Sequence, residues 1–150
     1  MIYHSLMQSR VNYCCSTWAA WKPRGNQQSL QRLQAVCNKF FRLIFNLDYR
    51  DSVRSILKSN NILNIYQNYD FKVCLTMHKA VNGELPIPLK NILTTENNLF
   101  FFKKCRIKQT QKSASYSGPT IWNGLPSQLI EESDFKKFKS HLKQTLLDIE

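Results

Sequence analysis

The feature that most restricts the fold is a run of apolar residues spaced three or four positions apart between residues 62 and 80. The members of this run are Ile62, Tyr66, Tyr69, Val73, Met77 and Ala80. Residues with this spacing share one face of an α-helix, because the helix turns once about every 3.6 residues. Gly83 follows where a left-handed C-terminal cap is expected, and Pro86 and Pro88 prevent continuation of the helix. The run therefore predicts an amphipathic helix that packs against a core.

Three further segments show helical spacing of apolar residues. Leu30, Leu33, Cys37, Phe40 and Ile44 predict a helix with Ser29 as N-cap and Asn46 at its end. A short helix is expected over residues 51–58, and a last helix from about Ser133. Glycine and proline are scarce, at four and five residues, which disfavours turn-dense β folds. The expected fold is therefore all-α, a small helical bundle with an irregular basic loop insert.

The chain is expected to have three parts that form one compact unit. These are a helical region over 1–86, an irregular basic connector over 87–117, and a Trp/Pro motif with the last helix over 118–150. In the connector, Leu99–Phe102 fits either a short buried strand or a helical turn. Turn residues are expected to dominate Gly118–Pro126.

The tryptophans have two possible roles in a chain of this kind. Trp122 is expected to anchor the core, as single tryptophans in small domains usually do. Trp18 and Trp21 could pack in the core or stack on nucleic-acid bases, and the sequence leaves both alternatives open.

Basic residues outnumber acidic ones, and their excess is concentrated in two segments. The chain has 21 Lys and Arg against 10 Asp and Glu, a formal net charge of +11. Residues 1–47 hold six basic residues and no acidic one, and residues 97–130 hold five and none. Such an excess favours a polyanionic partner, either nucleic acid or an anionic membrane surface.

The candidate nucleic-acid-binding residues lie in these two segments. Arg32, Lys39 and Arg42 are expected opposite the apolar stripe of the helix that follows Ser29, so that their cationic groups face solvent along one strip. Cations at such intervals suit the phosphates along a groove. The alternative is a solvated helix face, although such faces usually mix both signs of charge. The candidates in the connector are Lys103, Lys104, Arg106 and Lys108, with Lys112 beyond them.

The sequence lacks signatures of catalysis and of metal binding. It has no phosphate-binding glycine motif, nucleophile elbow or zinc-protease motif, and its scattered acids form no set for two-metal chemistry. The three histidines, His4, His78 and His141, are expected at the surface or in helix packing. Cys14 and Cys15 could in principle ligate a metal with His4, but adjacent side chains point in different directions and the sequence has no second pair, so no metal site is expected.

The cysteines and the hydropathy indicate a compartment. Five cysteines at irregular spacing favour reduced thiols over a disulfide framework. We find neither the apolar run of a signal peptide nor a stretch long enough to span a bilayer. The expected location is intracellular, in the nucleus or the cytoplasm, with no membrane partner.

Five sequence blocks, taken in order, carry a resemblance to a known family. They are YHSLMQSRVNYCCSTW (Tyr3–Trp18), LQRLQAVCNKFFRLI (Leu30–Ile44), ILNIYQNYDFKVCLTMHKAVNGELP (Ile62–Pro86), GPTIWNGLP (Gly118–Pro126) and FKKFKSHLKQTLL (Phe135–Leu147). Over almost the whole chain they resemble the C-terminal region of jockey-like non-LTR retrotransposon reverse transcriptases. In that family the region follows the palm and contains the helical thumb and the tail beyond it.

The resemblance implies a partner rather than an activity of this chain. The family's catalytic aspartates, in the palm signature Tyr-x-Asp-Asp, lie upstream, and Tyr49-Arg50-Asp51 lacks the second aspartate. We therefore expect no RNA-directed DNA polymerase activity from the chain alone and no cofactor in it, since the magnesium ions would belong to the missing palm. The thumb's task of holding the template and primer backbone, an RNA–DNA hybrid or duplex, would fall to Arg32, Lys39 and Arg42.

The same resemblance implies that the chain is a fragment of a larger protein. Surface that would pack on the palm is then exposed, with Ile2, Leu6, Val11 and Tyr13 as candidates, and self-association is expected. The alternative function is a helical protein-interaction module, or an inert remnant of a mobile element, whose apolar stripe binds a partner helix.

Overall fold

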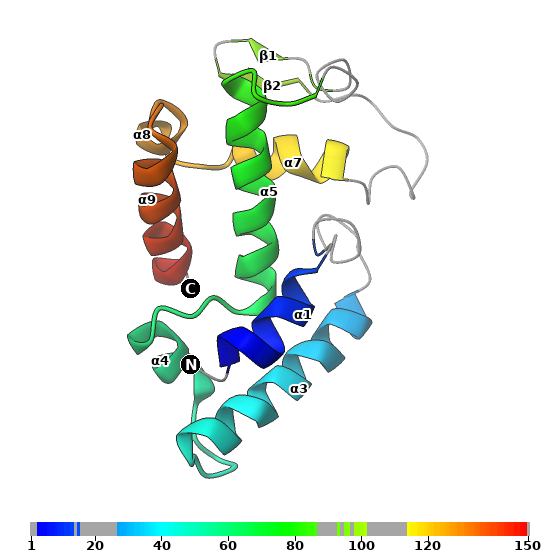
Figure 1. Cartoon of the computed structure of the whole chain (residues 1–150), viewed down its shortest axis with the longest axis vertical. Coiled ribbons are helices and arrows are strands. Elements are labelled where there is room, and N and C mark those ends of the chain that lie inside the picture. The colour runs from blue at the N-terminus through cyan, green and yellow to red at the C-terminus, as the bar shows by residue number, and fades with distance from the viewer. Residues whose placement is uncertain are drawn as a thin grey trace.

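Helices dominate the structure, as the sequence predicts. The computed structural model describes residues 3–13, 15, 27–86, 93, 95–96, 98–101 and 114–149. Its elements are η1 (Tyr3–Gln8), α1 (Ser9–Asn12), α3 (Gln27–Phe45), α4 (Val53–Ser59), α5 (Ile65–Val81), β1 (Thr95–Glu96), β2 (Leu99–Phe100), α7 (Ala114–Trp122), α8 (Ser127–Ile130) and α9 (Phe135–Asp148) (Figure 1). The strands pair antiparallel, with Thr95 opposite Phe100. The all-α class is confirmed, and within the described ranges no helix has the length and apolar character needed to cross a membrane.

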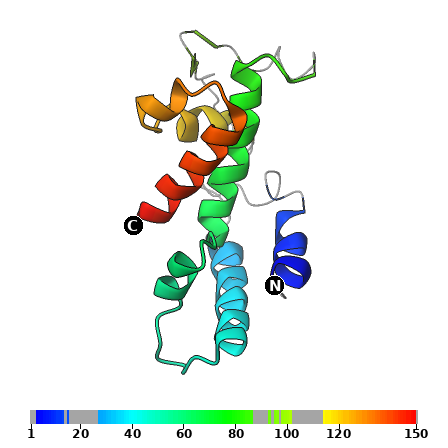
Figure 2. The same ribbon diagram turned by 60° about the vertical axis from the view of Figure 1, so that its left-hand side comes forward.

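Helix α5 is the central element, and the others are arranged along it (Figures 1 and 2). Helices α7 and α9 pack against α5, while α1, α3 and α4 lie toward its N-terminal end. Hydrogen bonds join this lower group to α5 in the part of the chain that the structure describes, for example at Ile65 and Asn68. The Ile65 N–H donates to Gln34 Oε1 of α3 over 2.9 Å, and Asn68 Nδ2 donates to Asn12 Oδ1 of α1 over 2.6 Å.

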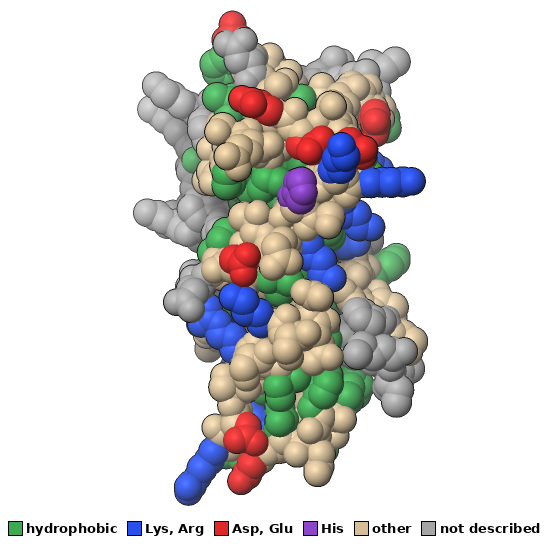
Figure 3. Space-filling model, turned by 90° about the vertical axis from the view of Figure 1, so that its left-hand side faces the viewer, with side chains coloured by type: hydrophobic (Ala, Val, Ile, Leu, Met, Phe, Trp, Pro, Cys, Tyr) green, Lys and Arg blue, Asp and Glu red, His purple; other side chains and the backbone are tan. Residues whose placement is uncertain are grey.

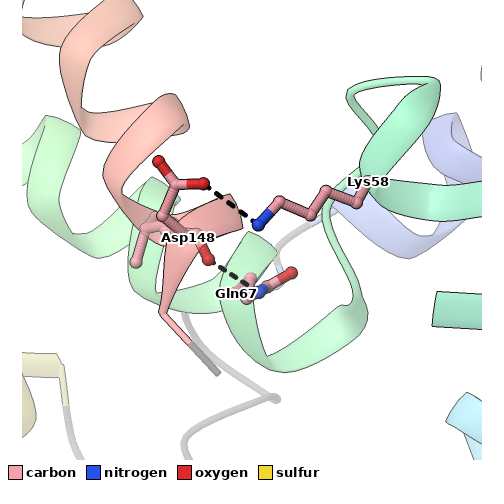
Figure 4. A network of polar contacts seen from close by, with 4 residues as sticks. Lys58, Gln67 and Asp148 are labelled. Atoms are coloured by element: carbon pink, nitrogen blue, oxygen red, sulfur yellow. Dashed lines mark hydrogen bonds and ion pairs between the residues drawn. The ribbon is translucent and has the colours of Figure 1, made fainter. Parts of the chain in front are cut away.

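A capping box begins α5 and also connects it to the end of α9. The Gln67 N–H donates to Asn64 Oδ1 over 2.8 Å, and the Asn64 N–H donates to Gln67 Oε1 over 3.1 Å. Gln67 Nε2 then donates to the Leu146 carbonyl over 2.7 Å (Figure 4). That carbonyl is among the last four of α9, which have no partner within the helix. Beside it, Lys58 and Asp148 form an exposed ion pair of 3.2 Å.

The upper core is built from aromatic rings of α5, α7, α9 and β2. Trp122 and Phe138 are fully buried, with ring centroids 5.6 Å apart, and Phe100 meets Trp122 edge-on at 6.0 Å. Trp122 Nε1 donates to the Asn98 carbonyl over 2.9 Å, so its polar atom is satisfied inside the core. The expected core role of Trp122 is confirmed, whereas Trp18 and Trp21 lie outside the described residues.

Several expected boundaries differ from the structure. Helix α3 already includes Gln27, so the assignment of Ser29 as N-cap is wrong, whereas its end at Asn46, which has a φ of 49°, is confirmed. Ile62 is buried in the turn before α5, because Asn64 starts the helix by capping it. The left-handed cap at Gly83, with a φ of 73°, is confirmed.

The segment expected to be dominated by turns is in part helical. Gly118 and Pro119 lie within α7, which ends at Trp122. A Cβ on Gly118 would overlap the methyl group of Met77 of α5, so a larger residue here would require the flexible Met77 side chain to move. Leu99 and Phe100 form a short strand, but of the expected buried strand only Phe100 is buried, since Leu99 and Phe101 are exposed.

Candidate nucleic-acid interface

Helix α3 separates its buried side chains from its charged ones, as its spacing predicts. Leu30, Cys37 and Phe41 are buried, whereas Arg32 and Lys39 are exposed. These two cations are seven residues apart, which is about two turns and about 10 Å along the axis. Burial raises the pKa of the Cys37 thiol, which disfavours the reactive thiolate and agrees with a packing role on this side of the helix.

Arg42 differs from the other two members of the predicted strip. It is half-buried, its Nη2 donates to the Asp51 carbonyl over 3.4 Å, and its guanidinium lies 5.7 Å from the centre of the Tyr49 ring. Asp51 in turn accepts the Asp48 N–H on its carboxylate over 2.9 Å. Arg42 is therefore held by the turn between α3 and α4, and only Arg32 and Lys39 project from the helix as the sequence predicts.

Exposed apolar side chains lie between the cations of α3. Val36 is 53% exposed and Leu43 is 81% exposed, and with Arg32 and Lys39 they follow a spacing of four, three and four residues along one side of the helix. Near the end of α3, Leu43 lines a surface hollow of about 460 Å³ with Lys39, Arg42, Asn46, Leu47 and Tyr49. The outward face of α3 is therefore cationic and apolar in alternation.

The candidates in the connector, Lys103, Lys104, Arg106 and Lys108, all lie outside the described residues. Of the candidates for a palm-facing apolar surface, Val11 is buried, so this prediction is wrong for Val11, whereas Tyr13 is 76% exposed. Ile2 and the side chain of Leu6 are outside the described part.

The structure brings together further lysines that the sequence-based candidates omit. Lys136, Lys139 and Lys143 follow one side of α9 at spacings of three and four. Helix α9 runs antiparallel to α5, and Lys79 of α5 reaches the Phe135 ring at the start of α9, with its Nζ 5.3 Å from the ring centre. Figure 3 shows basic side chains spread over this flank of the molecule, with acidic side chains between them. The lysines of α9 are visible in the sequence, whereas the approach of Lys79 to the start of α9 depends on tertiary packing.

The histidines take the structural roles expected of them where they are described. The His78 ring stacks on Phe138 at 4.3 Å, its Nε2–H donates to the Glu132 carbonyl over 2.9 Å, and its Nδ1 accepts from Asn82 over 3.1 Å. His141 is exposed. In the described part of the chain, no three His, Cys, Asp or Glu side chains gather where they could hold a metal ion.

Comparison of the chain with known protein families, curated proteins and solved structures finds no match.

Proposed function

We propose that this chain is a non-catalytic C-terminal region of a non-LTR retrotransposon reverse transcriptase, and that it binds the backbone of the template–primer duplex. The observation that carries the proposal is the pair Arg32 and Lys39, exposed two turns apart on a helix without an acidic residue. Contacts to backbone phosphates need cations but no side chains placed to contact base edges. A helix face with exposed cations therefore suits nucleic-acid binding that is independent of sequence. The resemblance of the five sequence blocks supports the family, and the irregular cysteines support an intracellular site of action, in the nucleus or the cytoplasm.

In this proposal the chemistry of polymerisation belongs to the palm of the parent protein. The magnesium ions and their carboxylate ligands are then palm components, and this chain contributes only positioning of the nucleic acid. Purified chain should accordingly give no primer extension with added magnesium, and measurable extension would refute the non-catalytic role.

The direct test is a titration with an RNA–DNA duplex at several salt concentrations. Each phosphate contact contributes about 0.9 to the slope of log affinity against log salt. Arg32→Gln with Lys39→Gln should therefore reduce the slope by about two, while circular dichroism shows an unchanged helix content. An unchanged slope and affinity in this folded double variant would contradict the proposal.

The second candidate is a helical protein-interaction module, and the exposure of Val36 and Leu43 favours it. Exposed apolar side chains at helical spacing suit the apolar face of a partner helix, either of the palm or of a second copy of the chain. Val36→Gln with Leu43→Gln leaves the charge unchanged. This variant should retain duplex affinity if the face binds phosphates, and should lose concentration-dependent self-association if the apolar residues mediate it.

A further inference from the structure

A second hollow lies between α3, α4 and the start of α5, and its polar lining consists mainly of hydrogen-bond donors. It has a volume of about 460 Å³ and is lined by Gln34, Asn38, Arg42, Ser52, Arg54 and Asn64, among others. We call it the Arg42–Arg54 hollow. Val53, Leu57 and Tyr66 supply its apolar wall. No acidic side chain is among these described lining residues.

Hydrogen bonds within the protein fix the orientation of all three amide side chains. The Ile65 N–H must face an acceptor, so the oxygen of Gln34 points to it over 2.9 Å. The nitrogen of Gln34 then donates to Asn38 Oδ1 over 2.8 Å. In the same way the Gln67 N–H fixes the oxygen of Asn64. The three amide oxygens are therefore occupied, and the amide nitrogens of Asn38 and Asn64 have donor capacity left.

The two arginines add charge to these donors. Both arginines line the hollow; Arg54 is exposed on α4, whereas the Arg42 Nε is closed off from solvent and has no hydrogen-bond partner among the described residues, so Arg42 contributes charge rather than this N–H. The Asp51 carboxylate, the nearest acid in sequence, accepts the Asp48 N–H and does not line the hollow. Asn64 also places the positive end of the α5 dipole here. A site with fixed donors, two guanidinium groups and no carboxylate is suited to an anion.

We propose that the Arg42–Arg54 hollow binds a phosphate group. Its donors come from three helices and therefore converge from different directions, which fits a tetrahedral anion better than a planar carboxylate. The apolar wall leaves room for the organic part of a phosphate ester. The site is separate from Arg32 and Lys39, so it does not depend on duplex binding along α3, and the phosphate can belong to a nucleic-acid backbone or to a free phosphate compound.

The first experiment is a titration with inorganic phosphate, followed by ¹H–¹⁵N NMR at constant ionic strength. Side-chain amide signals of Asn38 and Asn64 should shift and saturate, whereas sodium acetate and sodium chloride should not reproduce the shifts. Arg54→Gln should weaken binding roughly tenfold, because it removes one charged donor. Shifts that phosphate and chloride produce equally, or an Arg54→Gln variant that binds as the wild type does, would overturn the proposal.

Asn38→Asp is a second variant that keeps the local structure. The new carboxylate would still accept the hydrogen bond from Gln34 Nε2, but the Asn38 amide N–H donor to the hollow would be replaced by a negative charge. Phosphate binding should therefore be lost. Gln28→Glu adds the same charge to α3 about 15 Å away along the helix and should bind phosphate nearly as the wild type does. Equal loss in both variants would show that only net charge matters and would refute a defined site.

The source of the phosphate is resolved by repeating the duplex titration with these variants. Weaker duplex binding by Arg54→Gln indicates a backbone phosphate, and unchanged duplex binding with loss of inorganic phosphate indicates a free phosphate compound. Arg32→Gln with Lys39→Gln should leave phosphate binding in the hollow intact. Failure of the duplex proposal and failure of the phosphate site are therefore distinguishable.

Discussion

Gln67 connects two helix ends, and its replacement should destabilise the fold by a calculable amount. Gln67→Ala removes the donor to the Leu146 carbonyl, 2.7 Å away, and the acceptor of the Asn64 N–H, 3.1 Å away. Each such bond contributes a net of about 0.5–1.5 kcal/mol. We therefore expect the free energy of unfolding to fall by about 1–3 kcal/mol, out of a typical total of about 5–15 kcal/mol.

The assay is equilibrium urea unfolding followed by circular dichroism, with two variants that divide the effect. Gln67→Glu keeps the acceptor within the capping box but turns a carboxylate oxygen toward the Leu146 carbonyl in place of the donor, so it should lose at least the bond to α9, about 0.5–1.5 kcal/mol. Asn64→Ala removes the cap alone, at a cost of about 1 kcal/mol. If Gln67→Glu were as stable as the wild type, the connection to Leu146 would contribute nothing and the reasoning would be refuted.

Three other substitutions test the core, a cap and a backbone conformation by the same unfolding assay. Phe138→Ala, at a fully buried ring, should cost about 3–5 kcal/mol, and a cost below 1 kcal/mol would exclude the described packing. The Lys136 and Lys137 N–H groups hold the pKa of the Asp134 carboxyl below its ordinary value. The ionised carboxylate therefore stabilises the fold above a pH of about 4, and this stabilisation is lost as the pH falls through the lowered pKa. Asp134→Asn should make the fall of stability on the acid side less steep. Gly83→Ala forces a side chain into a φ of 73° and should cost about 1–2 kcal/mol, whereas a neutral result would contradict the left-handed cap.

Long helices were predictable from the sequence because their apolar period is set by local geometry. This holds for α3, α5 and α9, in which residues such as Cys37, Val73 and Leu142 are buried at the spacing that a helix requires. Helix α7 was not predictable in this way. Gly118 and Pro119 have turn chemistry in isolation, whereas in the structure they lie within a helix that packs against α5.

The candidate site was predictable to a similar extent. The helical spacing of the sequence correctly predicts that Arg32 and Lys39 are exposed, because the exposure of these two side chains follows from the geometry of α3 alone. It cannot show that Arg42 turns toward Asp51 and Tyr49, since that depends on the conformation of the following turn. The Arg42–Arg54 hollow was also beyond reach, because it exists only where α3, α4 and α5 meet.

The central position of α5 has a consequence for the chain during its synthesis. The helix ends at Val81, and the residues of α9 that cover it begin only at Phe135. At the usual rate of about 5–20 residues per second, the ribosome needs about 3–10 s to make the chain between them. For that time the side of α5 that α9 covers lacks this partner and is open to chaperones and to neighbouring nascent chains.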